Sequence, residues 1–145
     1  MFPKKTFKED LAYGLEREEP VRQLLKRVFN DEEDIINTKD LYNDDYCKFD
    51  YKGITTRRRY EVKSRTNSKD KYPTTLIPVH KITPKTTKYG LILVFNFTDK
   101  CCYIKYEPEL FSKFKIRTMK IFRIGKYDPP TDHYEIPISH LIDMV

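Results

Sequence analysis

The sequence contains little of what several protein classes require. No apolar run approaches the length of a membrane-spanning helix, and the first residues, MFPKKTFKED, lack the apolar core of a signal peptide. The three histidines are widely spread, so we do not expect a zinc site. The three cysteines are an odd number without ligand spacing. We expect reduced thiols in an intracellular protein, cytoplasmic or nuclear, that is neither secreted nor bound to a membrane.

The composition that remains predicts a single globular domain over residues 1–145. Nine Phe and eleven Tyr can build a modest core, and charged residues make up 34% of the chain. The chain contains no internal repeat, no low-complexity tract and no stretch typical of an interdomain linker.

Charge is distributed unevenly along the chain. The net charge is +6, but residues 57–88 hold ten Lys and Arg against only two acids, Glu61 and Asp70. Such a block suits a polyanion such as nucleic acid, although a run of charge is more often a solvated face. The candidate nucleic-acid-binding residues are Arg57, Arg58, Arg59, Arg65, Lys69, Lys71, Lys81 and Lys85.

Hydrophobic periodicity predicts one amphipathic helix followed by a series of strands. The helix covers residues 8–29 and is bent or divided at Pro20, and residues 35–36 start an edge strand or pack a loop. The expected strands cover residues 46–51, 58–65, 90–97, 101–106, 116–124 and 134–138. The other expected features are a turn starting at Lys52-Gly53, a short extended or one-turn segment at 76–82, a helical turn at 108–114 and a C-terminal helix from Ser139 to Met144.

The hairpin formed by strands 46–51 and 58–65 carries the most informative pattern. Side chains alternate between the two faces of a strand, so pairing the apolar faces puts Tyr51 with Tyr60. The same pairing gathers Asp50, Glu61 and Lys63 on the opposite face. Two carboxylates beside an amine form a potential divalent-metal site with a general base or charge stabiliser. The simpler alternative is an exposed cross-strand salt bridge, which is common and weak.

The spacing of Asp50, ten residues and then Glu61-Val62-Lys63 resembles the PD-(D/E)xK nuclease superfamily. The resemblance implies that Asp50 and Glu61 hold Mg²⁺, or Mn²⁺ in its place, with the Val62 carbonyl as a further ligand. It implies that Lys63 orients or deprotonates the attacking water. A G-x-x-x-E pattern before the hairpin makes Glu18 the third carboxylate, whereas Glu16 and Glu19 lie on the predicted solvated side of the helix.

Lys81 matches the Lys or Gln that related nucleases often carry after the E-x-K strand to contact phosphate or the attacking water; the alternative is an ordinary surface lysine. The fold implied is α/β, bordering on α+β, with a restriction-endonuclease-like core. That core is a mixed central sheet with the amphipathic helix on one face and the hairpin carrying the site. Three prolines, Pro73, Pro78 and Pro84, depart from the pattern, because they disfavour the helix expected before the fourth strand.

The resemblance implies a divalent-metal-dependent endonuclease acting on DNA, with RNA not excluded. Small members resemble Holliday-junction resolvases and phage or viral repair nucleases, so we expect structure- or end-directed cleavage in repair, recombination or processing, and a homodimer where paired cuts are needed. The alternative is a non-catalytic nucleic-acid-binding module that uses the basic block 57–88. Two acids at the centre of that block would repel phosphate unless a cation compensates them.

Overall fold

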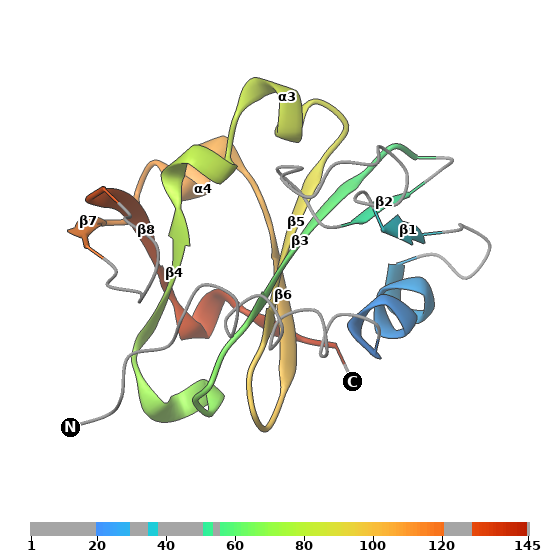
Figure 1. Ribbon diagram of the computed structural model, residues 1–145, viewed down its shortest axis with the longest axis horizontal. Coiled ribbons are helices and arrows are strands. Elements are labelled where there is room, and N and C mark those ends of the chain that lie inside the picture. The colour runs from blue at the N-terminus through green and yellow to red at the C-terminus, as the bar shows by residue number, and fades with distance from the viewer. Residues whose placement is uncertain (1–19, 30–34, 38–50, 54–55, 121–128, 145) are drawn as a thin grey trace.

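The computed structural model describes residues 20–29, 35–37, 51–53, 56–120 and 129–144 (Figure 1). Its strands form a six-stranded sheet, with the order β1-β2-β3-β5-β6-β9, and a three-stranded sheet, with the order β4-β8-β7. The first sheet comprises β1 (Ile35–Asn37), β2 (Tyr51–Gly53), β3 (Arg59–Ser64), β5 (Leu91–Asn96), β6 (Cys101–Lys105) and β9 (Ile142–Asp143). The second comprises β4 (Thr74–Pro78), β7 (Ile116–Met119) and β8 (Thr131–Pro137). With few helices beside a mixed sheet, the architecture is α+β.

One parallel pair makes the larger sheet mixed. β3 runs parallel to β5, with Glu61 beside Leu93 and Lys63 beside Phe95. The other neighbours, β1–β2, β2–β3, β5–β6 and β6–β9, are antiparallel. A parallel pair requires a long crossover. Here the crossover contains η1 (Lys69–Lys71), β4, η2 (Val79–Lys81) and the short helix α3 (Pro84–Thr87).

Strand β5 is apolar throughout because both of its faces are covered. Leu91, Leu93 and Phe95 belong to a cluster shared with the smaller sheet and with the short helix α4 (Pro108–Phe111). Ile92 and Val94 belong to a second cluster on the opposite face. In Figure 1 the smaller sheet lies to the left of the larger one, and the blue helix of residues 20–29 lies to its right.

Helix 20–29 covers the second face through an apolar stripe. Val21 and Leu25 are fully buried in the same cluster as Tyr60 and Val62, and the Phe29 ring packs on the Tyr60 ring with the ring centroids 5.7 Å apart. The predicted amphipathic helix is therefore confirmed where it is described, from Pro20 onwards. The predicted residues 8–19 lie outside the described part of the chain.

Several predicted strands are confirmed. Residues 35–37 form the edge strand β1, and 59–64, 91–96 and 101–105 form β3, β5 and β6 within the predicted ranges. The helical turn predicted at 108–114 is α4. Cys101 and Cys102 are free thiols that pack on opposite faces of β6. Of the predicted strand 116–124, the structure describes β7 followed by Lys120, and residues 46–50 and 121–124 lie outside it.

The turn predicted at Lys52-Gly53 is wrong. Both residues belong to β2, where Gly53 lies opposite Ile35 and Lys52 opposite Arg59. The chain reverses later: the Gly53 N–H donates to the Arg58 carbonyl at 2.9 Å. Arg57 takes the positive φ, 61°, that a tight turn needs.

The C-terminal helix predicted from Ser139 is also wrong, as is the expectation that 134–138 is the last strand. A single 3-10 turn, η3 (Ile138–His140), is followed by β9, and the Met144 N–H donates to the Cys101 carbonyl at 2.9 Å. The open edge of β6 supplies backbone partners that a short local helix lacks. The short extended or one-turn segment predicted at 76–82 is confirmed: it comprises the end of β4 followed by the single turn η2.

No helix among the described residues is long and apolar enough to cross a membrane.

Candidate functional site

The site is centred on Glu61, near the middle of β3. Alternation along β3 sends Tyr60 and Val62 into the cluster that contains helix 20–29, and Glu61 and Lys63 towards the smaller sheet. Glu61 lies beside Leu93 of β5, the strand with the most buried side chains in the described part of the chain. Only 2% of the Glu61 surface is exposed. The prediction that Glu61 and Lys63 share a face is confirmed. An exposed cross-strand bridge does not describe this carboxylate, because it is buried.

Two amines converge on one oxygen of this carboxylate. Lys63 Nζ lies 3.2 Å and Lys81 Nζ 3.4 Å from Glu61 Oε1. About a quarter of each lysine side chain is exposed, so both reach solvent while their amines remain on the buried carboxylate. Together the three groups carry a net charge of +1. This trio suits an anion better than the lone carboxylate would.

The other oxygen of Glu61 has no such partner. Oε2 is buried and accepts no hydrogen bond from any described residue. A buried acceptor left without a donor costs about 1–3 kcal/mol, and more when it is charged. A cation at Oε2 would remove this cost, and a carboxylate oxygen is the ligand type that Mg²⁺ prefers. The Glu61 carboxylate therefore fits a divalent cation.

The lysine that completes the trio is held by the start of the α3 segment. Lys81 ends η2, and its carbonyl accepts a hydrogen bond from the buried Thr86 hydroxyl at 3.0 Å. Thr83 and Thr86 form a reciprocal capping box in which each side chain accepts the other's backbone N–H, and Pro84 occupies the first turn. The backbone at Lys81 is thus fixed by the cap at Thr83 and Thr86, which lies well after the end of β3 in the sequence.

The predicted partner Asp50 lies outside the described residues. Its prediction required Tyr51 to share a face with Tyr60, and these two residues are paired across β2 and β3 and buried in one cluster. The Val62 side chain packs in that same cluster, and the ligand predicted at this residue is its backbone carbonyl. Within the described part of the chain, no group of three or more His, Cys, Asp or Glu side chains comes together.

Glu18, Glu16 and Glu19 also lie outside the described residues. The stripe predicted to carry Glu18 includes Val21 and Leu25, and these pack with Tyr60 and Val62 on the face of the sheet opposite Glu61. The helical register behind the prediction is therefore supported at Val21 and Leu25, but this stripe does not face the Glu61 carboxylate.

The basic block does not form one continuous surface. Arg59 is buried, and Arg65 is half-buried: its guanidinium donates to the Leu76 carbonyl and lies 5.4 Å from the centroid of the Phe95 ring. Burial lowers the pKa of Arg65 to about 10. Of the predicted nucleic-acid-binding residues, Arg59 and Arg65 thus contribute to the interior.

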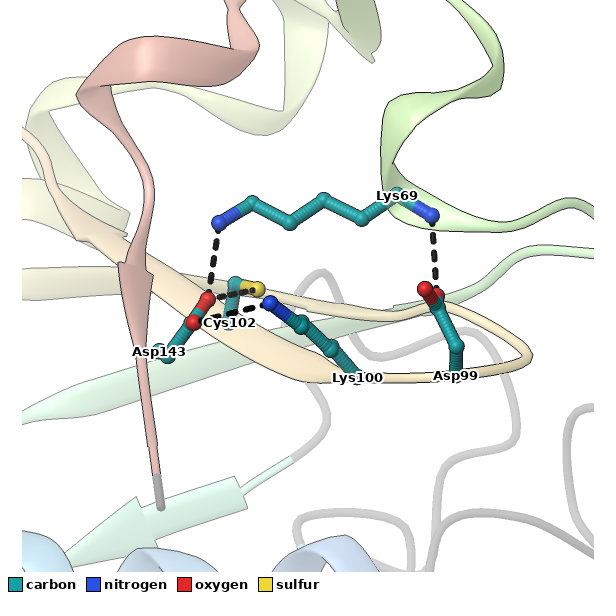
Figure 2. A network of polar contacts seen from close by, with 5 residues as sticks. All are labelled: Lys69, Asp99, Lys100, Cys102 and Asp143. Atoms are coloured by element: carbon teal, nitrogen blue, oxygen red, sulfur yellow. Dashed lines mark hydrogen bonds and ion pairs between the residues drawn. The ribbon is translucent and has the colours of Figure 1, made fainter.

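Lys69 belongs to a network that fastens three segments together (Figure 2). Its amine donates to Asp143 Oδ1 at 2.7 Å, and its backbone N–H donates to Asp99 at 2.9 Å. The hydrogen bond to Asp143 raises the pKa of Lys69, and with the Cys102 thiol it lowers that of Asp143 to about 2. Lys100 approaches the other oxygen of Asp143 at 3.5 Å. Lys69 therefore ties the crossover to β9 and to the β5–β6 turn.

Four other predicted basic residues remain near solvent. Arg57, Lys71 and Lys85 are exposed, and Arg58 is half-buried with its guanidinium 5.6 Å from the centroid of the Phe29 ring. Tyr89, which sequence reasoning did not select, contacts both Arg57 and Lys88. The sequence signal for Tyr89 was local: it stands between a lysine and a glycine, directly before the most apolar strand.

No protein-family model matches the chain, and no curated protein or solved structure matches it significantly.

Proposed function

We propose that this chain is a divalent-metal-dependent nuclease of the PD-(D/E)xK type that hydrolyses phosphodiester bonds of DNA. The observation that carries the proposal is the state of Glu61: buried, with two lysine amines on one oxygen and no described partner on the other. A buried carboxylate needs compensating charge, and a divalent cation at the second oxygen would supply it.

The surrounding sheet supports a restriction-endonuclease-like core. β3 has an antiparallel neighbour, β2, on one side and a parallel neighbour, β5, on the other, and the crossover between β3 and β5 carries Lys81. The resemblance implied this order of elements. The additional sheet β4-β8-β7 takes the place of the long helix that the three prolines disfavoured.

Glu61 Oε2 and the predicted partner Asp50 would hold Mg²⁺, with the Val62 carbonyl as the implied further ligand. When bound, the ion supplies a water of lowered pKa and stabilises charge on the transferring phosphate. Lys63 and Lys81 pair with the buried Glu61 carboxylate, and about a quarter of each lysine side chain is exposed at the site. There they can bind the scissile phosphate, orient the attacking water and stabilise the charge that develops on the phosphate oxygens.

A non-catalytic nucleic-acid-binding module is the second candidate, and one observation favours it. Lys63 and Lys81 already neutralise Glu61 without a metal, so the acid need not repel phosphate. The two candidates differ in metal dependence, since only the nuclease requires a divalent ion.

The test is nicking of a supercoiled plasmid with Mg²⁺ or Mn²⁺ and with EDTA, using Glu61→Gln and Asp50→Asn. Each variant should lose cleavage by a factor of roughly 10² or more while binding DNA as tightly as wild type or more tightly, because less negative charge faces phosphate. Glu135→Gln is the matched control. Glu135 pairs with the exposed Arg117 at 2.6 Å in the smaller sheet, so its substitution should leave cleavage unchanged. Wild-type cleavage by either site variant would refute the nuclease; metal-independent DNA binding without any cleavage would establish the binding module.

A further inference from the structure

A second cluster of aromatic and cationic side chains lies at the N-terminal end of β3. Tyr89 is 39% exposed, and Arg57 Nη1 donates to its hydroxyl at 3.1 Å. The guanidinium carbon of Arg57 and Nζ of Lys88 lie 5.4 and 5.3 Å from the centroid of its ring. The hydrogen bond from Arg57 and the charge of Lys88 lower the pKa of the Tyr89 hydroxyl. Two cations therefore gather around one exposed ring.

The backbone on both sides of this contact has a positive φ. Arg57 has φ of 61°, and Gly90, next to Tyr89, has φ of 101°. Hydrogen bonds fix both: the Arg57 N–H donates to the Gly53 carbonyl at 3.0 Å, and the Gly90 carbonyl accepts from Arg59 at 2.9 Å. Few residues other than glycine adopt a positive φ, and such residues cluster at functional sites.

The turn between β2 and β3 accounts for the positive φ of Arg57, and its hydrogen bonds fix where the Arg57 side chain starts. The cation–π contacts at this exposed ring add little to stability. The Tyr89 ring is therefore held beside two cations while it remains open to a ligand.

We infer that Tyr89, flanked by Arg57 and Lys88, is a stacking platform for an unpaired nucleobase, with the two cations binding the adjoining phosphates. Aromatic rings that stack bases beside Arg and Lys are the common means by which proteins hold single strands. A duplex offers no such contact, because each base is covered by its neighbours in the stack. The ligand class is therefore single-stranded nucleic acid: an end, a flap or a loop.

The position of the platform fits the site at Glu61. Arg57 and Glu61 are four residues apart, at most about 14 Å along an extended backbone. The short segment from Lys81 to Tyr89 joins the two places, with Lys81 on Glu61 at its start and Tyr89 on Arg57 at its end. This reading rests on the proposed function: a base held at Tyr89 would direct the following phosphates along β3 towards the lysines, so cleavage would fall near a junction between single and double strand.

The experiment measures binding in EDTA at one fixed salt concentration, so that cleavage cannot interfere. Fluorescent 15-nucleotide dT and U strands and a blunt duplex are titrated with wild type, Tyr89→Ala and Tyr89→Phe. Tyr89→Ala should weaken single-strand binding about 5- to 150-fold, the usual size for one stacked base, and change duplex binding less than twofold. Tyr89→Phe, which keeps the ring, should stay within about threefold of wild type. The dT and U arms distinguish DNA from RNA.

Tyr72→Ala is the matched control. Tyr72 is 53% exposed and has Lys71 Nζ 5.5 Å from its ring centroid, but it follows η1, whereas Tyr89 contacts Arg57 at the N-terminal end of β3. The Tyr72→Ala variant should bind single strands as tightly as wild type does. A 5-iodouracil strand should crosslink to Tyr89, identified by mass spectrometry of the peptide.

The platform is overturned if Tyr89→Ala binds single strands like wild type, or if Tyr72→Ala loses as much. Each failure is separate from failure of the nuclease. A chain that cleaves DNA but ignores Tyr89 refutes the platform alone, whereas a chain that loses single-strand binding in Tyr89→Ala but never cleaves refutes the nuclease alone.

Discussion

Replacing Glu61 by methionine separates a metal site from a structural ion cluster. The change removes a buried oxygen without a described partner, which costs the wild type about 1–3 kcal/mol, and fills the space with an apolar chain of similar size. It also removes two ion pairs. Their loss should cost less than the roughly 3–5 kcal/mol of a fully buried broken pair, because a quarter of each lysine is exposed and the freed amines can turn to water. The gains and losses nearly cancel.

We therefore expect Glu61→Met, in EDTA, to be as stable as wild type within about 1 kcal/mol, or more stable. For a chain of this size, 1 kcal/mol corresponds to a shift in Tm of roughly 4 °C. In Mn²⁺ at a hundredfold excess over its Kd, the wild type should gain about 2.7 kcal/mol, or roughly 10 °C, and Glu61→Met nothing. Glu135→Met should keep the gain, since its carboxylate pairs with Arg117 in the other sheet.

Scanning calorimetry with and without metal measures all of these quantities. A structural cluster gives the reverse result: loss of about 3–5 kcal/mol in Glu61→Met, as for a broken buried pair, and no effect of Mn²⁺ on the wild type. That outcome would refute the reasoning from the unpartnered oxygen.

Two further predictions concern the supports of the site. Thr86→Val should lower the free energy of unfolding by about 1–3 kcal/mol and reduce cleavage, because the Lys81 carbonyl and the Thr83 N–H lose their buried partner; Thr86→Ser should restore both in urea titrations and nicking assays. The lowered pKa of Asp143, about 2, contributes stability that is fully present above its ordinary value of 3.8 and is lost as pH falls through about 2. In Asp143→Asn, the free energy of unfolding should therefore fall less steeply than in the wild type as pH decreases from about 4 to 2. An equally steep fall would show that Lys69 does not stabilise the folded carboxylate.

Period-two alternation was enough to predict which side chains of β3 share a face. It placed Glu61 with Lys63, and Tyr51 with Tyr60, because a strand leaves each side chain only two directions. The unbroken apolar run of 90–97 likewise predicted a strand covered on both faces. These are local properties of the sequence, and the structure keeps them.

Local sequence patterns could not predict which segments far apart in the chain pair with each other. Lys81 was selected as a phosphate contact, but its approach to Glu61 depends on a crossover whose course no local pattern specifies. Pro78 argued against a long helix and is compatible with the end of an edge strand such as β4, but no local pattern indicated that this strand pairs with β8. Ser139 is a good helix cap in isolation, but the open edge of β6 attracted the chain into β9 instead.

A lone glycine also proved a poor marker of the turn. Gly53 pairs within the sheet, and Arg57 adopts the positive φ. Sequence reasoning assigns such a conformation to glycine or asparagine by preference.

The crossover from β3 to β5 has a consequence for how the molecule folds and opens. Its strand β4 is built into the smaller sheet by pairing with β8, some sixty residues later in the chain, as in the pair Leu76 and Glu135. Contacts of such sequence separation form late, since a long loop must close first. Lys81 follows β4 directly, so Glu61 acquires its second amine only after the C-terminal third of the chain has docked. Amide protons of β4 and β8 should then exchange together, and each opening of that pair would release Lys81 from the carboxylate without unfolding the larger sheet.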